Sequence, residues 1–199
     1  MAPPEAEPRL PSIVAVAASA GGVTALRTLI DALPSDLPAA VLVVQHLDPL
    51  GQSQLASILQ RRSKLHVVEA EDGAVPEDGC VYVAPPGRHL VVADDGSLGL
   101  TDTPVRHWVR PSADELFESV ARRYAGRAIA VVLTGTGSDG AEGSYAVQLQ
   151  GGTVVVQDPA TSEFSGMPRA AIRAGTVTTV VPLAEIAGTL VTLLRERNA

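Results

Sequence analysis

Cysteine, aromatic side chains and long apolar runs are all scarce in this sequence of 199 residues. The single cysteine, Cys80, excludes an internal disulfide and a multi-cysteine metal cluster, and it is typical of a reducing compartment. No apolar stretch reaches the ~18–20 residues that a membrane-spanning helix needs. The acidic, proline-containing N-terminus also lacks the basic start and apolar run of a signal peptide. We therefore expect a cytoplasmic protein with no membrane insertion.

Positive charge is scarce as well. The chain carries 15 basic and 22 acidic residues, for a formal net charge of −7. This balance argues against a nucleic-acid-binding protein, which usually presents a basic surface. Hydrophobic residues make up 46% of the chain but aromatic residues only 3%, so its core must consist of Val, Leu, Ile and Ala. Such a core is typical of a buried, mostly parallel sheet covered by helices.

The order of predicted elements indicates one domain over residues 12–199, preceded by a disordered lead-in at 1–11. Strand-like and helix-like segments alternate, except that 65–101 holds short strands joined by Asp, Gly and Pro turns. We therefore predict a doubly wound α/β fold with helices on both faces of a mostly parallel sheet and a short antiparallel insertion at about 65–101. The main strands are expected at 13–17, 39–44, 128–133, 153–157 and 177–181.

Three polar residues each follow a predicted central strand. Ser19 follows the strand at 13–17, His46 the second strand, and Asp139 lies in the segment after the third. Taken alone, each has a common structural explanation, such as a helix cap for Ser19. In a parallel sheet, however, ligands bind beyond the carboxyl ends of the strands, so one fold assumption brings all three together. The pattern favours a serine catalytic triad.

The segment that holds Asp139 also allows two other interpretations. It contains a G-x-G-x-x-G pattern, and Asp158 follows near the spacing of a ribose-binding acid, which would indicate a Rossmann-like dinucleotide-binding domain. Asp139 and Glu142 also resemble a capping-box pair. A dinucleotide-binding domain would not need Ser19 or His46, and it usually carries its glycines in the first βα unit. The glycines of the pattern are Gly135, Gly137 and Gly140.

Six separated motifs, in order along residues 12 to 195, resemble the catalytic domain of the chemotaxis protein-glutamate methylesterases, the CheB family. The motifs are ASAGG at 18–22, QH at 45–46, APPGRH at 84–89, RPSADELF at 110–117, LTGTGSDGA at 133–141 and GMPRAAI at 166–172. The resemblance implies that Ser19 is the nucleophile, His46 its base and Asp139 the acid that orients the base. It also implies hydrolysis of γ-glutamyl methyl esters on the cytoplasmic domain of a methyl-accepting chemoreceptor, with release of methanol. Deamidation of receptor glutamines is a second activity implied by the family.

For this mechanism we expect the backbone N–H groups of Ala20 and Thr136 to bind the oxyanion, with no metal and no cofactor. His89, Arg110 and Met167 are expected to contact substrate, with Met167 in a Met-Pro turn at the edge of the site. Typical family members have Thr at position 20 and often Met at position 136.

Most family members also carry an N-terminal receiver domain. The sequence predicts a stand-alone catalytic domain, regulated by a separate response-regulator partner. A non-catalytic CheB-like signalling protein is the remaining alternative.

Overall fold

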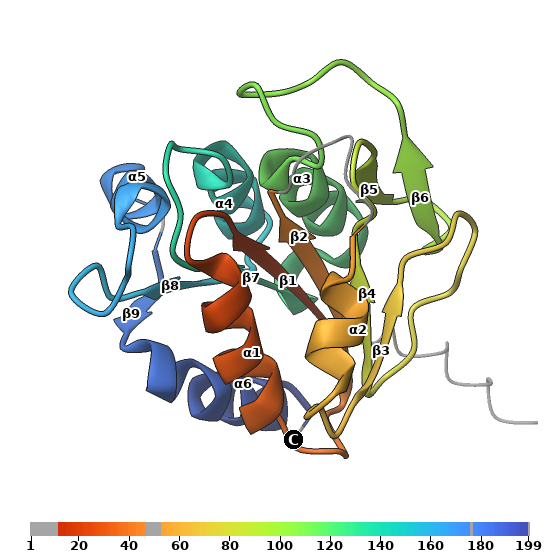
Figure 1. Ribbon diagram of the computed structural model, residues 1–199, viewed down its shortest axis with the longest axis horizontal. Coiled ribbons are helices and arrows are strands. Elements are labelled where there is room, and N and C mark those ends of the chain that lie inside the picture. The colour runs from red at the N-terminus through yellow and green to blue at the C-terminus, as the bar shows by residue number, and fades with distance from the viewer. Residues whose placement is uncertain (1–11, 47–52, 176, 199) are drawn as a thin grey trace, which may run out of the picture.

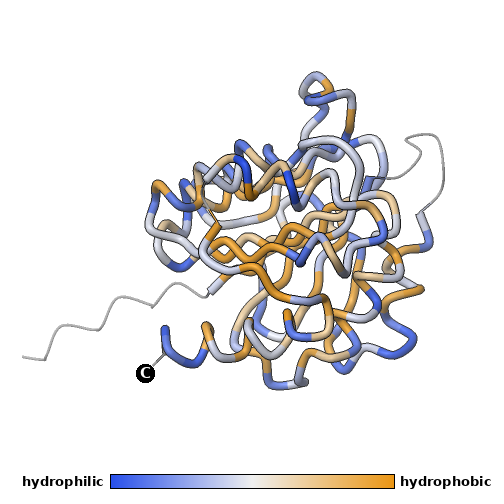
Figure 2. Tube along the Cα trace, turned by 90° about the vertical axis from the view of Figure 1, so that its left-hand side faces the viewer, coloured by the Kyte–Doolittle hydropathy of each residue, from blue (hydrophilic) through white to orange (hydrophobic). Residues whose placement is uncertain are grey.

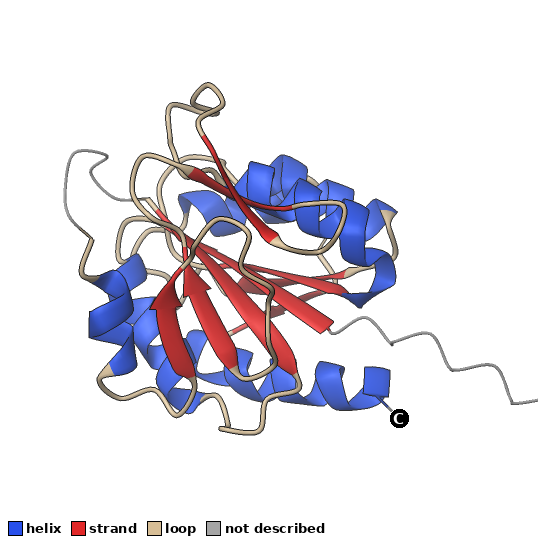
Figure 3. Ribbon diagram, turned by 90° about the vertical axis from the view of Figure 1, so that its right-hand side faces the viewer, coloured by secondary structure: helices blue, strands red, loops and turns tan. Residues whose placement is uncertain are grey.

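The fold has three layers. The computed structural model describes residues 12–46, 53–175 and 177–198, and the predicted lead-in at 1–11 lies outside them. A twisted sheet lies between two layers of helices (Figures 1 and 3). None of the helices in the described part of the chain has both the length and the apolar character needed to cross a bilayer.

The central sheet has seven strands, all parallel, in the order β3-β4-β2-β1-β7-β8-β9. Every residue of β1, β2 and β7 is buried, as expected for strands covered on both faces. The strands are β1 Ser12–Ala18, β2 Ala39–Gln45, β3 His66–Glu69, β4 Cys80–Val83, β7 Ala128–Val132, β8 Thr153–Gln157 and β9 Thr179–Val181.

Alternate residues of the strands face two separate cores. In β1, Ile13, Ala15 and Ala17 pack toward α3, α4 and α5, whereas the residues between them pack toward α1, α2 and α6. The most hydrophobic segments accordingly run through the middle of the molecule (Figure 2). The helices are α1 Gly22–Ala32, α2 Leu55–Gln60, α3 Ala113–Tyr124, α4 Ala141–Leu149, α5 Gly166–Arg173 and α6 Leu183–Asn198, and a short 3-10 helix η1, Ala125–Arg127, precedes β7.

The predicted fold class is confirmed, and the structure narrows its antiparallel part. Only β5 (His89–Val92) and β6 (Leu98–Thr101) form the small antiparallel sheet, which packs on α3. β3 and β4 instead extend the central sheet in parallel. The sequence of a short strand bounded by turn residues does not show whether it pairs parallel or antiparallel with its neighbour. For this reason the antiparallel insertion was expected to be longer than it is.

The topology singles out the carboxyl end of β1. From β1 the chain passes to β2 on one side, while β7 pairs with the other side of β1. In open α/β sheets this change of direction opens a crevice for ligands beyond the strand ends. The segments that follow β1, β2 and β7 therefore meet at the expected place for an active site.

Candidate active site

Ser19 lies in a tight turn between β1 and α1. Its N–H donates to the carbonyl of Thr134 beyond β7 (3.0 Å), and its own carbonyl accepts from Gly22 N–H (2.8 Å). Gly21, between them, has a φ of 74°, a conformation that glycine adopts without strain. The turn holds Ser19 at the positive end of the α1 dipole, where developing negative charge is favoured.

His46 and Asp139 are hydrogen bonded to each other. The distance from His46 Nε2 to Asp139 Oδ2 is 2.8 Å, and the side chains are 11% and 3% exposed. The segment that follows β2 therefore reaches the segment that follows β7, although 93 residues separate the two side chains in sequence. With Nε2 bound to the carboxylate, Nδ1 is the ring nitrogen available to accept a proton.

Asp139 also caps the first turn of α3. Oδ2 accepts from Ala113 N–H (2.6 Å), and Oδ1 accepts from Asp114 N–H (3.2 Å) and from the Ser112 hydroxyl (2.7 Å). A helix N-terminus offers unpaired N–H groups and a partial positive charge, so it stabilises a buried carboxylate. Asp139 is thus a capping residue as well as the partner of His46, but it caps α3 rather than the helix that follows it.

The two buried acids here have opposite pKa shifts. Burial alone would raise the pKa of Asp139, but hydrogen bonds from His46, the Ala113 N–H and the Ser112 hydroxyl lower it to about 2. Burial raises the pKa of Asp114 to about 7, and the nearby negative charge of Asp139 adds to the shift. The negative charge near neutral pH is therefore concentrated on Asp139, next to His46.

Two buried polar residues without a role in the sequence analysis hold the backbone of the site. Gln45 Nε2 donates to the carbonyls of Ser19 (2.8 Å) and His46 (3.0 Å), and so joins the ends of β1 and β2. The Thr134 hydroxyl donates to Ala20 O (3.0 Å) and accepts from Phe164 N–H (2.9 Å). Apart from His46 O, their backbone partners lie far away in sequence, so no local pattern indicated these roles.

Ser19 packs so closely against residue 135 that this position requires glycine. A Cβ atom built on Gly135 would lie 2.2 Å from Met167 Sδ and 2.8 Å from Ser19 Cβ. The first glycine of the G-x-G-x-x-G pattern therefore makes room for the serine. Asp158, the expected ribose-binding acid, accepts from Ala160 N–H (2.8 Å) and closes a local turn. These contacts give the glycine pattern and Asp158 structural roles, and the dinucleotide-binding alternative has no support.

The predicted triad lines one pocket of about 400 Å³. Among the described residues, the Ser19 hydroxyl has no hydrogen-bond partner, so it is free to face a substrate. The opposite rim is a tight turn in which Trp108 is 95% exposed. The pocket is lined by Ser19, His46, Asp139, Thr136, Gly137, Ser138, His107, Trp108 and Val109.

Comparison with known proteins identifies the family of this chain. The family model described as CheB methylesterase matches residues 14–190, which include Ser19, His46 and Asp139. The chain belongs to the CheB methylesterase family.

Relatives in this family are similar over nearly the whole chain. Protein-glutamate methylesterase/protein-glutamine glutaminase 3 of Burkholderia orbicola is 44% identical over 91% of this chain and 53% of its own length. The corresponding protein 4 of Burkholderia thailandensis is 43% identical over 99% of this chain and 57% of its own length. The chain thus spans about half the length of these curated relatives.

A solved structure shows the same fold. The crystal structure of the Thermotoga maritima CheB methylesterase catalytic domain superposes with a TM-score of 0.89 at 37% sequence identity. The match covers 92% of this chain and 99% of the other.

Ala20 and Thr136 are the two residues that were expected to depart from the usual pattern of the CheB family. Ala20 follows Ser19 in the turn before α1, and Thr136 is an exposed residue of the pocket wall. Within the described residues, neither backbone N–H is bonded to an acceptor. Both N–H groups are therefore available as donors. The side chains at positions 20 and 136 do not change this, because the donor belongs to the backbone.

None of the three residues expected to contact substrate lines the pocket. His89 is 0% exposed: its Nδ1 accepts from Ser112 N–H (3.1 Å), and its Nε2 lies 3.3 Å from Pro104 O. Burial lowers the pKa of His89, as expected for a neutral structural histidine. Arg110 donates to the Thr103 carbonyl (3.1 Å) and braces the loop before α3. The ring nitrogens of His89 and one guanidinium nitrogen of Arg110 thus contact the backbone of this loop, and substrate contact by either residue stays a prediction.

Met167 is placed differently from its expected turn. It lies in the first turn of α5, where a following proline is tolerated because the first N–H groups of a helix have no partners inside it. Its side chain is 1% exposed and packs against Gly135 beneath Ser19. Met167 therefore supports the floor of the site and presents almost no surface to a substrate.

Proposed function

We propose that this chain is a serine hydrolase that demethylates γ-glutamyl methyl esters on the cytoplasmic domain of a methyl-accepting chemoreceptor. The observation that carries the proposal is the buried His46–Asp139 hydrogen bond in the pocket that also holds Ser19. The relatives are named protein-glutamate methylesterase/protein-glutamine glutaminase, and these names supply the substrate class. We place the reaction in the cytoplasm.

The proposed reaction has two steps. The Ser19 oxygen attacks the ester carbonyl while its proton passes to His46 Nδ1, and the Asp139 carboxylate stabilises the resulting imidazolium. The backbone N–H groups of Ala20 and Thr136 stabilise the tetrahedral oxyanion, each donor being worth about 3 kcal/mol. The proton returns from His46 to the departing methoxide, which leaves as methanol.

Hydrolysis of the acyl-enzyme then completes the cycle. His46 takes a proton from water, the hydroxide attacks the acyl carbonyl, and Ser19 recovers its proton. With a glutamine side chain the same sequence releases ammonia, which accounts for a glutaminase activity at the same site. None of the steps uses a metal ion or an organic cofactor.

The test is covalent labelling followed by turnover. A fluorophosphonate probe should label Ser19 in the full chain, with the labelled peptide identified by mass spectrometry. Ser19→Ala should abolish labelling and lower methanol release from a methylated receptor fragment about 10⁶-fold, to background. Ser97→Ala, in the turn between β5 and β6, is the matched control and should leave both unchanged. Full methanol release by Ser19→Ala would disprove the proposed nucleophile.

A further inference from the structure

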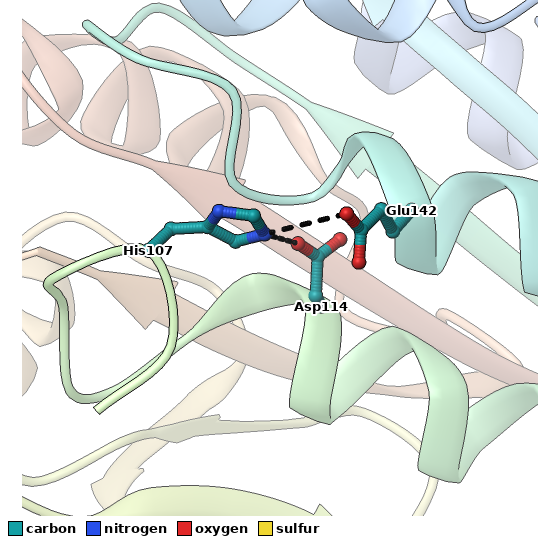
Figure 4. A group of neighbouring side chains, drawn as sticks. All are labelled: His107, Asp114 and Glu142. Carbon is teal, nitrogen blue, oxygen red and sulfur yellow. Dashed lines mark ion pairs between the residues drawn. The ribbon is translucent and has the colours of Figure 1, made fainter. Parts of the chain in front are cut away.

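Three side chains that the hydrolysis does not use converge beside the pocket. His107 comes from the turn before α3, Asp114 from the first turn of α3, and Glu142 from the first turn of α4 (Figure 4). One ligand atom from each lies within 4.8 Å of the others. Nε2 of His107 is 3.1 Å from Asp114 Oδ2 and 3.8 Å from Glu142 Oε1. The cluster thus combines one imidazole nitrogen with two carboxylate oxygens.

Asp114 contributes a buried carboxyl group with one unsatisfied oxygen to this cluster. Its side chain is 0% exposed, and Oδ1 accepts from Gly143 N–H at 2.6 Å. Oδ2 lies at ion-pair distance from His107 Nε2 (3.1 Å), but this oxygen has no hydrogen-bond partner among the described residues. Such a buried oxygen usually has a partner, because burial without one removes its hydrogen bonds to water and replaces them with nothing.

The surrounding charges favour a cation. Arg106 donates to Glu118 (2.7 Å) and to Glu142 Oε2 (2.6 Å), and it pairs with Glu115 at 3.4 Å. This one guanidinium faces three glutamates, while Asp114 adds a fourth carboxyl group at the same place. Glu142 Oε1, the oxygen not bonded to Arg106, remains directed at His107 (Figure 4).

We propose that His107 Nε2, Asp114 Oδ2 and Glu142 Oε1 bind a divalent first-row transition-metal ion, with Zn²⁺ the best matched. Zinc bonds to nitrogen and oxygen at about 2.0–2.2 Å, so two tetrahedral ligand atoms lie roughly 3.4 Å apart. The observed separations of 3.1 and 3.8 Å lie on either side of that value. An imidazole ligand favours zinc and its neighbours over Mg²⁺ and Ca²⁺, which prefer oxygen.

The position of the site suggests a structural role next to the pocket. A bound ion would join the turn at residues 106–109 to the first turns of α3 and α4. His107 is followed directly by Trp108, which lines the pocket, so the ion would fix the backbone turn from which that indole projects. The metal acts as a clamp on the pocket rim and takes no part in the hydrolysis.

Binding can be measured without reference to activity. The full chain, freed of metal with a chelator, is titrated with Zn²⁺ in a calorimeter, and we expect one ion per chain with micromolar or tighter affinity. Co²⁺ should quench the fluorescence of Trp108, which is the one tryptophan of the sequence. Absence of saturable binding at millimolar Zn²⁺ would overturn the proposal.

Variants locate the ion. His107→Asn and Glu142→Gln should each weaken Zn²⁺ binding at least tenfold and reduce the Co²⁺ quenching; Asn suits position 107 because it tolerates the local φ of 50°. His66→Asn, an exposed histidine of β3, is the matched control and should bind Zn²⁺ normally. Because His46 and Asp139 are also potential ligands, His46→Asn is measured too. If this variant loses the ion while His107→Asn keeps it, the site is the catalytic pair and the proposal fails.

Discussion

The Asp139 carboxylate accepts hydrogen bonds from two sources, the His46 ring on one side and the first turn of α3 on the other. All of its partners favour the ionised form, which is why its pKa is low although the group is buried. The same bonds fix the direction of the carboxylate, and therefore the tautomer of His46 that has Nδ1 free. One side chain thus supplies both the charge and the orientation that the proposed base requires.

Replacing Asp139 by Asn should slow the reaction far more than it disturbs the fold. The amide keeps an oxygen acceptor for α3 but loses the charge, and it no longer holds His46 with Nε2 protonated. We expect kcat for methanol release to fall about 10⁴-fold, as for the equivalent change in other triads. Labelling of Ser19 by fluorophosphonate should slow in parallel. Equal labelling rates in wild type and Asp139→Asn would show that Asp139 does not assist His46.

The triad could be predicted from the sequence because each of its residues follows a strand, and the carboxyl ends of parallel strands lie at the same edge of the sheet. Gln45 and Ser112 were not assigned roles, since their partners are backbone or carboxylate groups far along the chain. The burial of His89 was not predicted, for a related reason. A histidine in a glycine- and proline-rich loop looks exposed in sequence, and only the packing of the loop over it shows that it is buried.

Helices α3 and α4 cap each other. Asp139, just before α4, accepts from the first N–H groups of α3, and Asp114 in α3 accepts from Gly143 N–H in the first turn of α4. These hydrogen bonds require α3 and α4 to lie close together. A Cβ on Gly143 would lie 2.6 Å from Phe117 Cβ and 3.0 Å from Asp114 Cα, so only glycine fits at this contact. Glycine at 143 therefore sets the distance at which the two helices meet.

Gly143→Ala should destabilise the protein, because the new methyl group would separate the two helices. We expect the free energy of unfolding in urea to fall by about 1–3 kcal/mol. Gly188→Ala in α6 is the matched change, since a Cβ there meets nothing within 4 Å. It should raise stability by up to about 1 kcal/mol, because alanine favours helix more than glycine. A neutral Gly143→Ala would contradict the close packing of α3 and α4.

At the level of helices and strands, apolar periodicity predicted most of the fold. It did not show that β3 and β4 join the central sheet, because strand direction depends on the connection between strands and not on the pattern within them. Helix α5 also stayed unpredicted. Its proline and short length look like a turn, and it becomes a helix by packing Met167 and Ala171 against the core.

At the scale of the whole molecule, the complete burial of His89 links the stability of the protein to pH. His89 lies between the β5–β6 sheet, the loop at 102–112 and α3, with both ring nitrogens bonded to backbone groups. Burial lowers its pKa in the folded protein, so the unfolded chain binds a proton at a higher pH than the folded one does. The contribution of His89 to stability is therefore present above pH ~6.5 and is lost as the pH falls below that value.

Urea unfolding at several pH values tests this link. Wild type should lose stability from His89 as the pH falls from about 6.5, by at most about 1.4 kcal/mol per pH unit for one proton. His89→Gln cannot take up that proton, so its stability should depend less on pH over the same range. Parallel pH profiles for the two proteins would mean that His89 is protonated equally well in the folded state.

The capping of α3 by Asp139 also determines how local motion affects catalysis. The amide protons of Ala113 and Asp114 are bonded to Asp139, so they exchange with solvent only when that turn opens. Each opening also removes the donors that keep Asp139 charged and aligned with His46. The rate of hydrogen exchange at these two amides therefore reports on the resting protein. The slower the exchange, the larger the fraction of molecules in which Asp139 is charged and aligned with His46.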